Sequence, residues 1–191
     1  MVQDGSLLES SCPFITEKLG EMEIESIQPY EMLSALPESA RKRFYDMAGF
    51  DYDEFAALFD ASPKKNLVII GTSHGSEESA RQQRDYVARI VEQYGEGYDI
   101  FFKFKPHPAD TSSAGYEIEF PGLTLLPGQM PFEIFVWALI DRVDMIGGYP
   151  STVFLTVPLD KVRFIFAANA ESMARPLNIL FRDATDVEWM Q

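Results

Sequence analysis

His107 has the residue type and the setting needed for phosphate chemistry. It stands between Pro106 and Pro108, and Lys103 and Lys105 lie just upstream. The two prolines restrict the backbone to a rigid turn, which would hold the imidazole beside cationic side chains in an otherwise acidic chain. An imidazole in that position can donate a hydrogen bond to a phosphate oxygen, or a proton to a departing one. On these residues alone, a loop histidine without a chemical role is the alternative.

Two hydroxyl groups occur together at Ser151 and Thr152. They follow the glycine pair Gly147-Gly148 and precede an apolar segment that predicts a helix. Hydroxyls and free backbone N–H groups at the start of a helix can bind an anionic phosphate, although a plain N-cap explains the same residues. The sequence contains no GxGxxG and no P-loop pattern, so the common dinucleotide and triphosphate sites find no support.

Glu133 lies in the first turn of another predicted helix, where the macrodipole favours a carboxylate. Helix capping is one interpretation. The other is that Glu133 accepts hydrogen bonds from ribose hydroxyls, as an acidic residue does in nucleotide-binding sheets. Together with His107 and the Ser151-Thr152 pair, it matches the requirements of a base, a sugar and one phosphate. No Asp/Glu cluster indicates magnesium, so we expect a nucleoside monophosphate conjugate, no metal and no cofactor.

Alternating strand and helix patterns must position these residues. Short β-branched runs predict strands, and apolar residues at helical spacing predict the helices between them. Strands are expected at 66–70, 99–104, 123–126, 143–146 and 162–166, and helices at 77–94, at 131–140 and from Ser151-Thr152 to before Pro158. Repeated strand-helix-strand units imply a parallel sheet with right-handed crossovers and helices on both faces. The expected fold class is therefore α/β with a Rossmann-like layout.

Ligands of such sheets bind beyond the carboxyl ends of the strands. The loops expected at that edge are 71–76, 105–110, 128–133 and 147–152. His107, Glu133 and the Ser151-Thr152 pair fall in three different loops of this set, which favours one shared site.

The character of the chain changes at about Pro63. Before it the sequence is acidic and helix-like, with a helix opened by Pro37 and closed by Gly49. After it the strand and helix patterns alternate. We therefore expect a mostly helical N-terminal segment at 1–62 and a Rossmann-like, nucleotide-binding domain at 63–191.

Composition limits the function classes. The 191 residues include 30 Asp and Glu against 16 Lys and Arg, a formal net charge of -14. That charge argues against a surface for nucleic acid or for an anionic membrane. No apolar run is long enough to span a bilayer and the N-terminus has no signal-peptide pattern, so the cytoplasm is the expected location. One cysteine and two histidines exclude an internal disulfide and the usual structural zinc sites.

Three motifs resemble those of bacterial sialyltransferases of glycosyltransferase families 52 and 80. Lys105-Pro106-His107-Pro108 resembles their His-Pro motif, Met130-Pro131-Phe132-Glu133 looks like the segment before their donor helix, and Gly147-Gly148-Tyr149-Pro150-Ser151-Thr152 resembles their Ser-Ser or Ser-Thr motif. The order and spacing also agree. The resemblance covers roughly 66–167. In addition, Gln3-Asp4-Gly5 resembles the second and third positions of the Asp/Glu-Asp/Glu-Gly motif that carries the family's acceptor base.

This resemblance implies the two-Rossmann GT-B architecture and metal-independent, inverting transfer of sialic acid from CMP-sialic acid to a glycan hydroxyl. Asp4 would deprotonate the acceptor hydroxyl, and His107 would contact or protonate the donor phosphate. The remaining donor contacts would come from the phosphate-binding Ser151 and Thr152, the ribose-binding Glu133, and the residues that line or adjoin the cytidine site, Lys105, Pro108, Gly71 and Thr72.

The partners implied by the resemblance are a nucleotide-sugar donor, a glycan acceptor and an N-terminal Rossmann half that would hold the acceptor. The three residues before Asp4 cannot form that half. We therefore expect the C-terminal portion of a longer enzyme, or a truncated relative, with weak or no activity alone. The uncovered face favours self-association into a homo-oligomer. A role in lipooligosaccharide or capsule biosynthesis would place the protein in the cytoplasm or peripherally at the inner membrane.

Two further functions remain open at this point. The first is a GT-B transferase or epimerase that uses another nucleotide sugar, which would be stabilised more by UDP than by CMP. The second is a truncated, non-catalytic module that binds a nucleotide or mediates oligomerisation.

Overall fold

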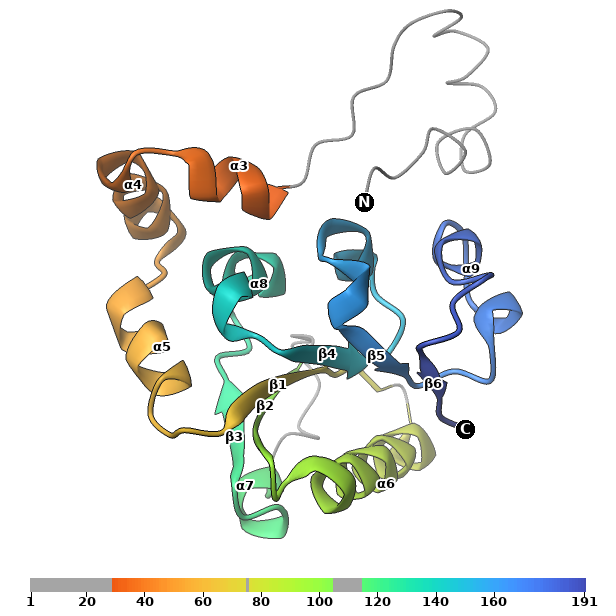
Figure 1. The fold of residues 1–191 in the computed structure, drawn as a ribbon. Helices are drawn as coiled ribbons and strands as arrows, with labels where there is room; N and C mark the ends of the chain where they lie inside the picture. The colour runs from red at the N-terminus through yellow and green to blue at the C-terminus, as the bar shows by residue number, and fades with distance from the viewer. Residues whose placement is uncertain (1–28, 75, 105–114) are drawn as a thin grey trace, which may run out of the picture.

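A six-stranded, all-parallel sheet forms the centre of the molecule. A computed structural model describes residues 29–74, 76–104 and 115–191, and its strands lie in the order β3-β2-β1-β4-β5-β6 (Figure 1). The strands are β1 (Lys65–Ile70), β2 (Tyr98–Lys103), β3 (Leu123–Leu126), β4 (Met145–Gly148), β5 (Val162–Ile165) and β6 (Glu188–Trp189). The α/β fold class expected from the sequence is confirmed.

The central strand β1 pairs with β2 on one side and with β4 on the other, both in parallel. All of its residues after Lys65 are buried, which explains why the run is apolar without alternation. The chain moves outward from β1 through β2 to β3 and then returns to β4 on the opposite side of β1. This reversal is a topological switch point, and ligands of open α/β sheets bind in the crevice that it leaves at the carboxyl ends of the strands.

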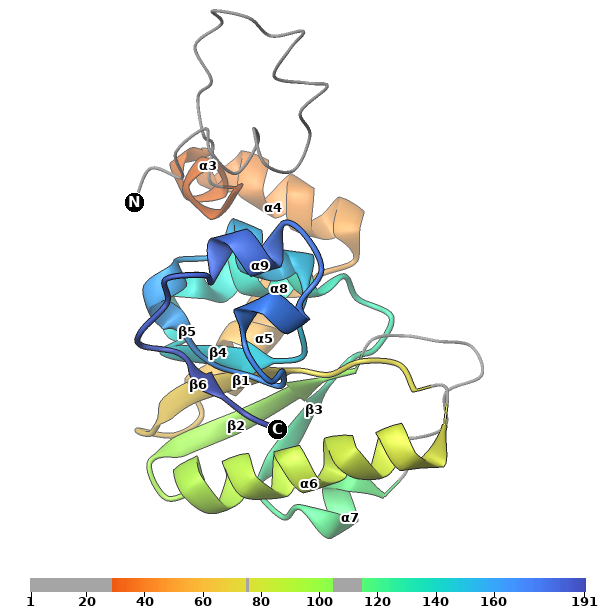
Figure 2. The same cartoon turned by 90° about the vertical axis from the view of Figure 1, so that its right-hand side faces the viewer.

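Helices cover both faces of the sheet (Figures 1 and 2). On one face lie α6 (Glu77–Tyr94) and α7 (Tyr116–Glu119), and on the other lie α5 (Tyr52–Phe59), α8 (Phe132–Leu139) and α9 (Leu177–Leu180). Successive residues of β1 point to opposite faces. Leu67 and Ile69 therefore join the core cluster under α6, whereas Val68 and Ile70 join the cluster under α8.

The helix α6 agrees with the range 77–94 expected from its periodicity. Its inner face buries Tyr86, Val87 and Ile90, and the Ser76 side chain caps its start by accepting the Ser79 N–H. Gly95 ends the helix as expected, but with a right-handed conformation and an N–H bond to the Val91 carbonyl. The left-handed cap typical of such a glycine is therefore not used here.

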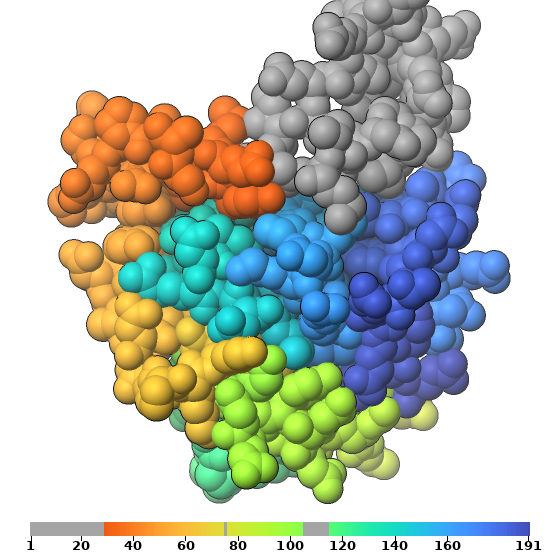
Figure 3. All heavy atoms as spheres, viewed as in Figure 1, coloured from red at the N-terminus to blue at the C-terminus, as the bar shows by residue number. Residues whose placement is uncertain are grey.

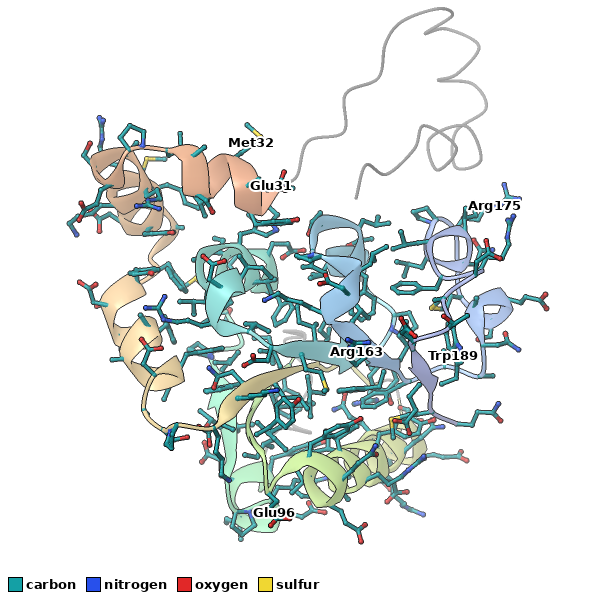
Figure 4. All side chains as sticks on the ribbon, viewed as in Figure 1. Glu31, Met32, Glu96, Arg163, Arg175 and Trp189 are labelled. Atoms are coloured by element: carbon teal, nitrogen blue, oxygen red, sulfur yellow. The ribbon has the colours of Figure 1, made fainter. Side chains whose placement is uncertain are left out.

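Three helices precede β1 in the described part of the chain: α3 (Pro29–Ala35), α4 (Glu38–Ala48) and α5. The sequence prediction of a helix after Pro37 that ends at Gly49 is confirmed, and Gly49 has the positive φ of 66° that favours glycine. Leu33 of α3 belongs to the core cluster that includes α8, and the space-filling view shows α3 resting on the body beside α8 (Figure 3). On the outer side of α3, Met32 is 57% exposed and points away from the body (Figure 4).

The segment after Ser151 is helical and ends before Pro158, as its sequence predicts, but it is not an α-helix. It forms a five-residue 3-10 helix, η2 (Thr152–Thr156). Pro158 prevents a longer α-helix because the residue before a proline disfavours the helical region, and Val157 indeed has an extended backbone. The elements α7, α9 and β6 were not expected from the sequence. Each has only two to four residues, too few to show a hydrophobic period.

Within the described ranges, none of the helices combines the length and the apolar character that crossing a membrane requires.

Candidate functional site at the carboxyl edge of the sheet

Five of the residues singled out in the sequence lie at the carboxyl edge of the sheet. Gly71 and Thr72 directly follow β1, Ser151 and Thr152 follow β4, and Glu133 is in the first turn of α8. Because β1 and β4 are adjacent and parallel, their following loops emerge side by side at the switch point. The other four predicted residues, Asp4, Lys105, His107 and Pro108, lie outside the described residues.

The loop after β1 is fixed by its neighbours on β2 and α6. The Gly71 N–H donates to the Lys103 carbonyl at 2.8 Å, and the Thr72 N–H donates to Gln83 Oε1 at 2.9 Å. Gln83 is fully buried, and its Nε2 donates onward to Tyr116 Oη at 3.2 Å. Gln83 therefore positions the backbone of Thr72. Its only sequence signal was a polar residue on the apolar face of a helix, which was not recognised.

The loop after β4 depends on two glycines in very close packing. A β-carbon on Gly147 would lie 2.4 Å from the Phe164 ring, and one on Gly148 would lie 2.2 Å from the Ile70 carbonyl oxygen. Gly148 also has a φ of 124°, and the Tyr149 N–H donates to the same Ile70 oxygen at 2.9 Å. The glycine pair thus allows the end of β4 to lie tightly against β1 and β5, which directs the following residues toward the crevice.

Ser151 is the N-cap of η2. Its Oγ accepts the Val153 N–H at 3.3 Å. The hydroxyl oxygen therefore caps the helix, as the capping interpretation expects. The hydroxyl proton remains able to donate, and the Thr152 side chain is exposed. Because η2 is a short 3-10 helix, its macrodipole is small, and phosphate binding here would depend on the hydroxyls and backbone N–H groups.

Glu133 is half-buried in the first turn of α8, whose N-cap, Pro131, makes no side-chain cap bond. Its charge acts on Lys103, at the end of β2. Burial lowers the pKa of Lys103 to about 8, and the Glu133 charge acts in the opposite direction. Lys103 is not the surface cation that its sequence position beside His107 indicated. As the last residue of β2 it directs its side chain inward, where only 3% is exposed.

Two further polar atoms are buried at the switch point and have no hydrogen-bond partner among the described residues. They are His74 Nε2, in the loop after β1, and Tyr149 Oη, directly after β4. The two rings meet edge to face with centroids 6.1 Å apart. Burial, and then the neighbouring Tyr86 and Tyr116, raise the pKa of Tyr149, so its hydroxyl stays neutral. Sequence reasoning did not assign Tyr149 a role, because its position after a glycine pair gives no sign of burial.

A cavity of about 630 Å³ lies away from this edge, between α3, α4, α5 and the end of α8. None of the predicted site residues lines it. Its three cations already have partners: Arg41 donates to the Ser34 carbonyl, Lys42 pairs with Asp46, and Arg142 pairs with Asp60 and donates to Tyr52 Oη. Aromatic residues such as Tyr45 and Trp137 form part of its wall. We therefore place the candidate site at the carboxyl edge and not in this cavity.

In the part of the chain that the structure describes, no three or more His, Cys, Asp or Glu side chains gather in a way that could hold a metal ion. The groups that the described residues offer at the edge are hydroxyls, backbone N–H groups, the half-buried carboxylate of Glu133, the buried ammonium of Lys103 and the imidazole of His74. Such a set can hold the ribose and the single phosphate of a nucleotide.

Comparison with solved structures finds the same fold in bacterial sialyltransferases. The chain is similar to the GT-B domain of a sialyltransferase from Photobacterium damselae, with a TM-score of 0.71 and 24% identity over 93% of this chain and 50% of that one. For an alpha/beta-galactoside alpha-2,3-sialyltransferase from Photobacterium phosphoreum, the TM-score is 0.65 and the identity is 24%, over 92% of this chain and 49% of that one. A Photobacterium 2,6-sialyltransferase was solved with donor product CMP and acceptor substrate lactose. Its TM-score is 0.62 and its identity is 18%, over 86% of this chain and 37% of that one.

These similarities show that the chain has the fold of part of the GT-B domain of bacterial sialyltransferases. The chain spans half or less of the length of the three structures. No protein-family model matches the sequence, and no curated protein matches it.

Proposed function

We propose that the chain is the donor-binding part of a glycosyltransferase that transfers sialic acid from CMP-sialic acid. The observation that carries this proposal is the grouping of Gly71, Thr72, Ser151 and Thr152 around the switch point of the sheet, with Glu133 in the first turn of α8 at the same edge. The sheet has the fold of solved bacterial sialyltransferases, and one of these was solved with CMP as donor product. The position and the residue types support the same substrate class.

Each described residue receives a role from its chemistry. Ser151 and Thr152 would donate their hydroxyl protons to the single phosphate, as the N–H groups at the start of η2 would. Glu133 would accept hydrogen bonds from the ribose hydroxyls. Gly71 and Thr72, whose backbone is fixed by Lys103 and Gln83, would adjoin the cytosine.

The bond changes in the proposed reaction balance without a metal. Asp4 would take the proton of the acceptor hydroxyl, whose oxygen attacks the anomeric carbon of the sialyl group from the face opposite the phosphate. The bond between that carbon and the CMP oxygen breaks, so the configuration inverts. His107 would hydrogen-bond to the departing phosphate or give it a proton. Asp4 and His107 carry these roles through the resemblance of their sequence motifs to those of bacterial sialyltransferases.

The acceptor glycan and the linkage would be set by parts of the fold that this chain does not span. The three sialyltransferase structures are at least twice as long as the matched region. Acceptor and donor must be held in one geometry for transfer, so we expect donor binding by this chain and little transfer by it alone.

A thermal-shift and calorimetric comparison of CMP, UDP and CMP-sialic acid tests the proposal. Ligands that bind only the folded state raise its melting temperature, so CMP and CMP-sialic acid should produce a larger shift than UDP at equal concentration. A larger shift with UDP would replace the proposal with a transferase or epimerase for another nucleotide sugar. If none of the three raises the melting temperature at millimolar concentration, the remaining function is that of a non-catalytic module that does not bind a nucleotide.

A further inference from the structure

Lys103 is unusual because it is a charged side chain inside the protein. It is 3% exposed, and the other buried polar side chains of the described residues, Asn66 and Gln83, carry no charge. Lysine is almost never fully buried unless it is paired. Its Nζ donates to the Phe104 carbonyl at 3.1 Å and to the Gly128 carbonyl at 2.8 Å. Burial of an ammonium group costs free energy, which indicates that Lys103 has a specific role at this position.

Lys103 connects the end of β2 to two of the loops at the carboxyl edge. It lies at the end of β2 and is in register with Ile70 of β1. Its backbone carbonyl accepts the Gly71 N–H at 2.8 Å, which fixes the loop after β1. Its Nζ holds the Gly128 carbonyl, which belongs to the loop between β3 and α8.

The same ammonium is electrostatically coupled to Glu133. The carboxylate of Glu133 favours the protonated form of Lys103, against the effect of burial. Gly128 precedes the first turn of α8 by only a few residues, and Glu133 lies in that turn. Lys103 therefore acts on Glu133 both through the loop that it holds and through its charge.

Lys161 shows what a comparable lysine does elsewhere in the fold. Its Nζ also bridges two backbone carbonyls, those of Ile140 and Val143. These carbonyls belong to η1 (Ile140–Arg142) and the residue after it, at the amino edge of the sheet just before β4. Lys161 thus has the same bonding pattern as Lys103 and none of its neighbours at the candidate site.

We propose that Lys103 is a positioning residue of the donor site, whose ammonium holds the loop at Gly128 so that Glu133 is presented to the ribose of the nucleotide. Glu133 makes the contact with the ligand and Lys103 makes none. This inference rests on the proposed function, because it takes Glu133 as the ribose ligand. It adds a residue that the sequence motifs do not contain.

The test compares Lys103→Met with the matched control Lys161→Met in the full chain. Methionine keeps an unbranched apolar side chain of similar reach and removes the donor. The dissociation constant for CMP is measured by calorimetry at a temperature where circular dichroism shows each variant folded. We expect Lys103→Met to weaken CMP binding at least tenfold and Lys161→Met to weaken it less than twofold. If the methionine variant does not fold, Lys103→Gln, which is too short to bridge both carbonyls, takes its place with the same expectation.

A double-mutant cycle with Glu133→Gln separates positioning from a general loss of structure. If Lys103 acts through Glu133, the two changes are not additive. Lys103→Met should then cost less than threefold when it is added to Glu133→Gln. A lysine that merely supports the fold would cost the same factor in both backgrounds.

The outcomes distinguish this inference from the proposed function. Equal CMP binding by the unmodified chain and by Lys103→Met would overturn the inference alone, as would an undiminished effect of Lys103→Met in the Glu133→Gln background. Absence of CMP binding by the unmodified chain would overturn the proposed function and, with it, the positioning role of Lys103.

Discussion

Gly148 of β4 lies so close to Ile70 of β1 that a β-carbon on it would stand 2.2 Å from the Ile70 carbonyl oxygen. The contact joins the two strands on either side of the switch point, at the edge where the candidate site lies. The Gly148 φ of 124° adds a second requirement for glycine. The end of β4 therefore tolerates no side chain at this position.

Replacement of Gly148 by alanine should destabilise the protein by more than about 2 kcal/mol, because the new methyl group meets backbone atoms and the backbone conformation is strained. Chemical denaturation followed by circular dichroism measures the loss. The control is Gly97→Ala, since a β-carbon there would meet nothing within 4 Å. A Gly148→Ala variant as stable as this control would contradict the close packing of β1 against β4.

Replacement of Gln83 by methionine should cost about 1–2 kcal/mol, because the partly buried Thr72 N–H loses its acceptor. CMP affinity should fall as well, since the loop after β1 is no longer fixed. Gln82→Met is the matched control on the same helix, where the amide donates to Tyr86 Oη at 2.8 Å and the residue is exposed. Calorimetric titration with CMP checks both variants, and equal affinities would remove the positioning role of Gln83.

Removal of the Tyr149 hydroxyl tests one of the two buried atoms that have no hydrogen-bond partner among the described residues. Tyr149→Phe should raise the free energy of unfolding by roughly 1 kcal/mol, because the unpartnered hydroxyl pays its desolvation cost without a hydrogen bond. Tyr116→Phe should do the opposite, since Tyr116 Oη accepts a bond from Gln83. Thermal and urea unfolding measure both. A destabilised Tyr149→Phe variant would show that the hydroxyl has a partner in solution.

The buried Lys103 should make the stability of the protein depend on pH. Its pKa is about 8 in the folded chain and 10.5 as an ordinary lysine, so between these values the unfolded state holds more protons. The free energy of unfolding therefore rises with pH across this window, by at most about 1.4 kcal/mol per pH unit. Tyrosines with a raised pKa, such as Tyr45, act in the opposite direction above about pH 10. Unfolding of the unmodified chain and Lys103→Met should be compared between pH 7 and pH 9.5. A difference that does not grow in favour of the unmodified chain would contradict the burial of the ammonium.

The phosphate role of the hydroxyls can be separated from capping. Combined replacement of Ser151 and Thr152 by Ala and Val should weaken CMP binding about tenfold or more, since two charge-assisted hydrogen bonds are lost. Asn169→Ala is the control, because Asn169 caps another short 3-10 helix, η4 (Ala170–Ser172), through the Ser172 N–H. It should lower stability slightly and leave CMP affinity unchanged. Equal affinities of the two variants would leave Ser151 with its capping role alone.

Much of the fold could be predicted because its signals are local. The range 77–94 of α6 and the range 123–126 of β3 were predicted without error, since an amphipathic period and a short apolar run are both patterns of a few neighbouring residues. The 3-10 helix after Ser151 was predicted as an apolar helix. There the packing of a short segment before Pro158 overrides the apolar pattern. The two-residue strand β6 forms one edge of the sheet and pairs with β5 alone. In the side-chain view, Arg163 marks β5 and Trp189 marks β6 (Figure 4).

The candidate site could likewise be predicted only in part from the sequence. The sequence by itself determined the residue types at the carboxyl edge, because the chain order of strands and loops decides which residues follow a strand. Only the tertiary structure decided that Lys103 is inside the protein, that Gln83 holds Thr72, and that Gly148 meets Ile70. These relationships join residues far apart in the chain, and no local pattern encodes them. They arise where β1, β2 and β4 converge, since a buried polar group must find its partner in whatever element lies next to it.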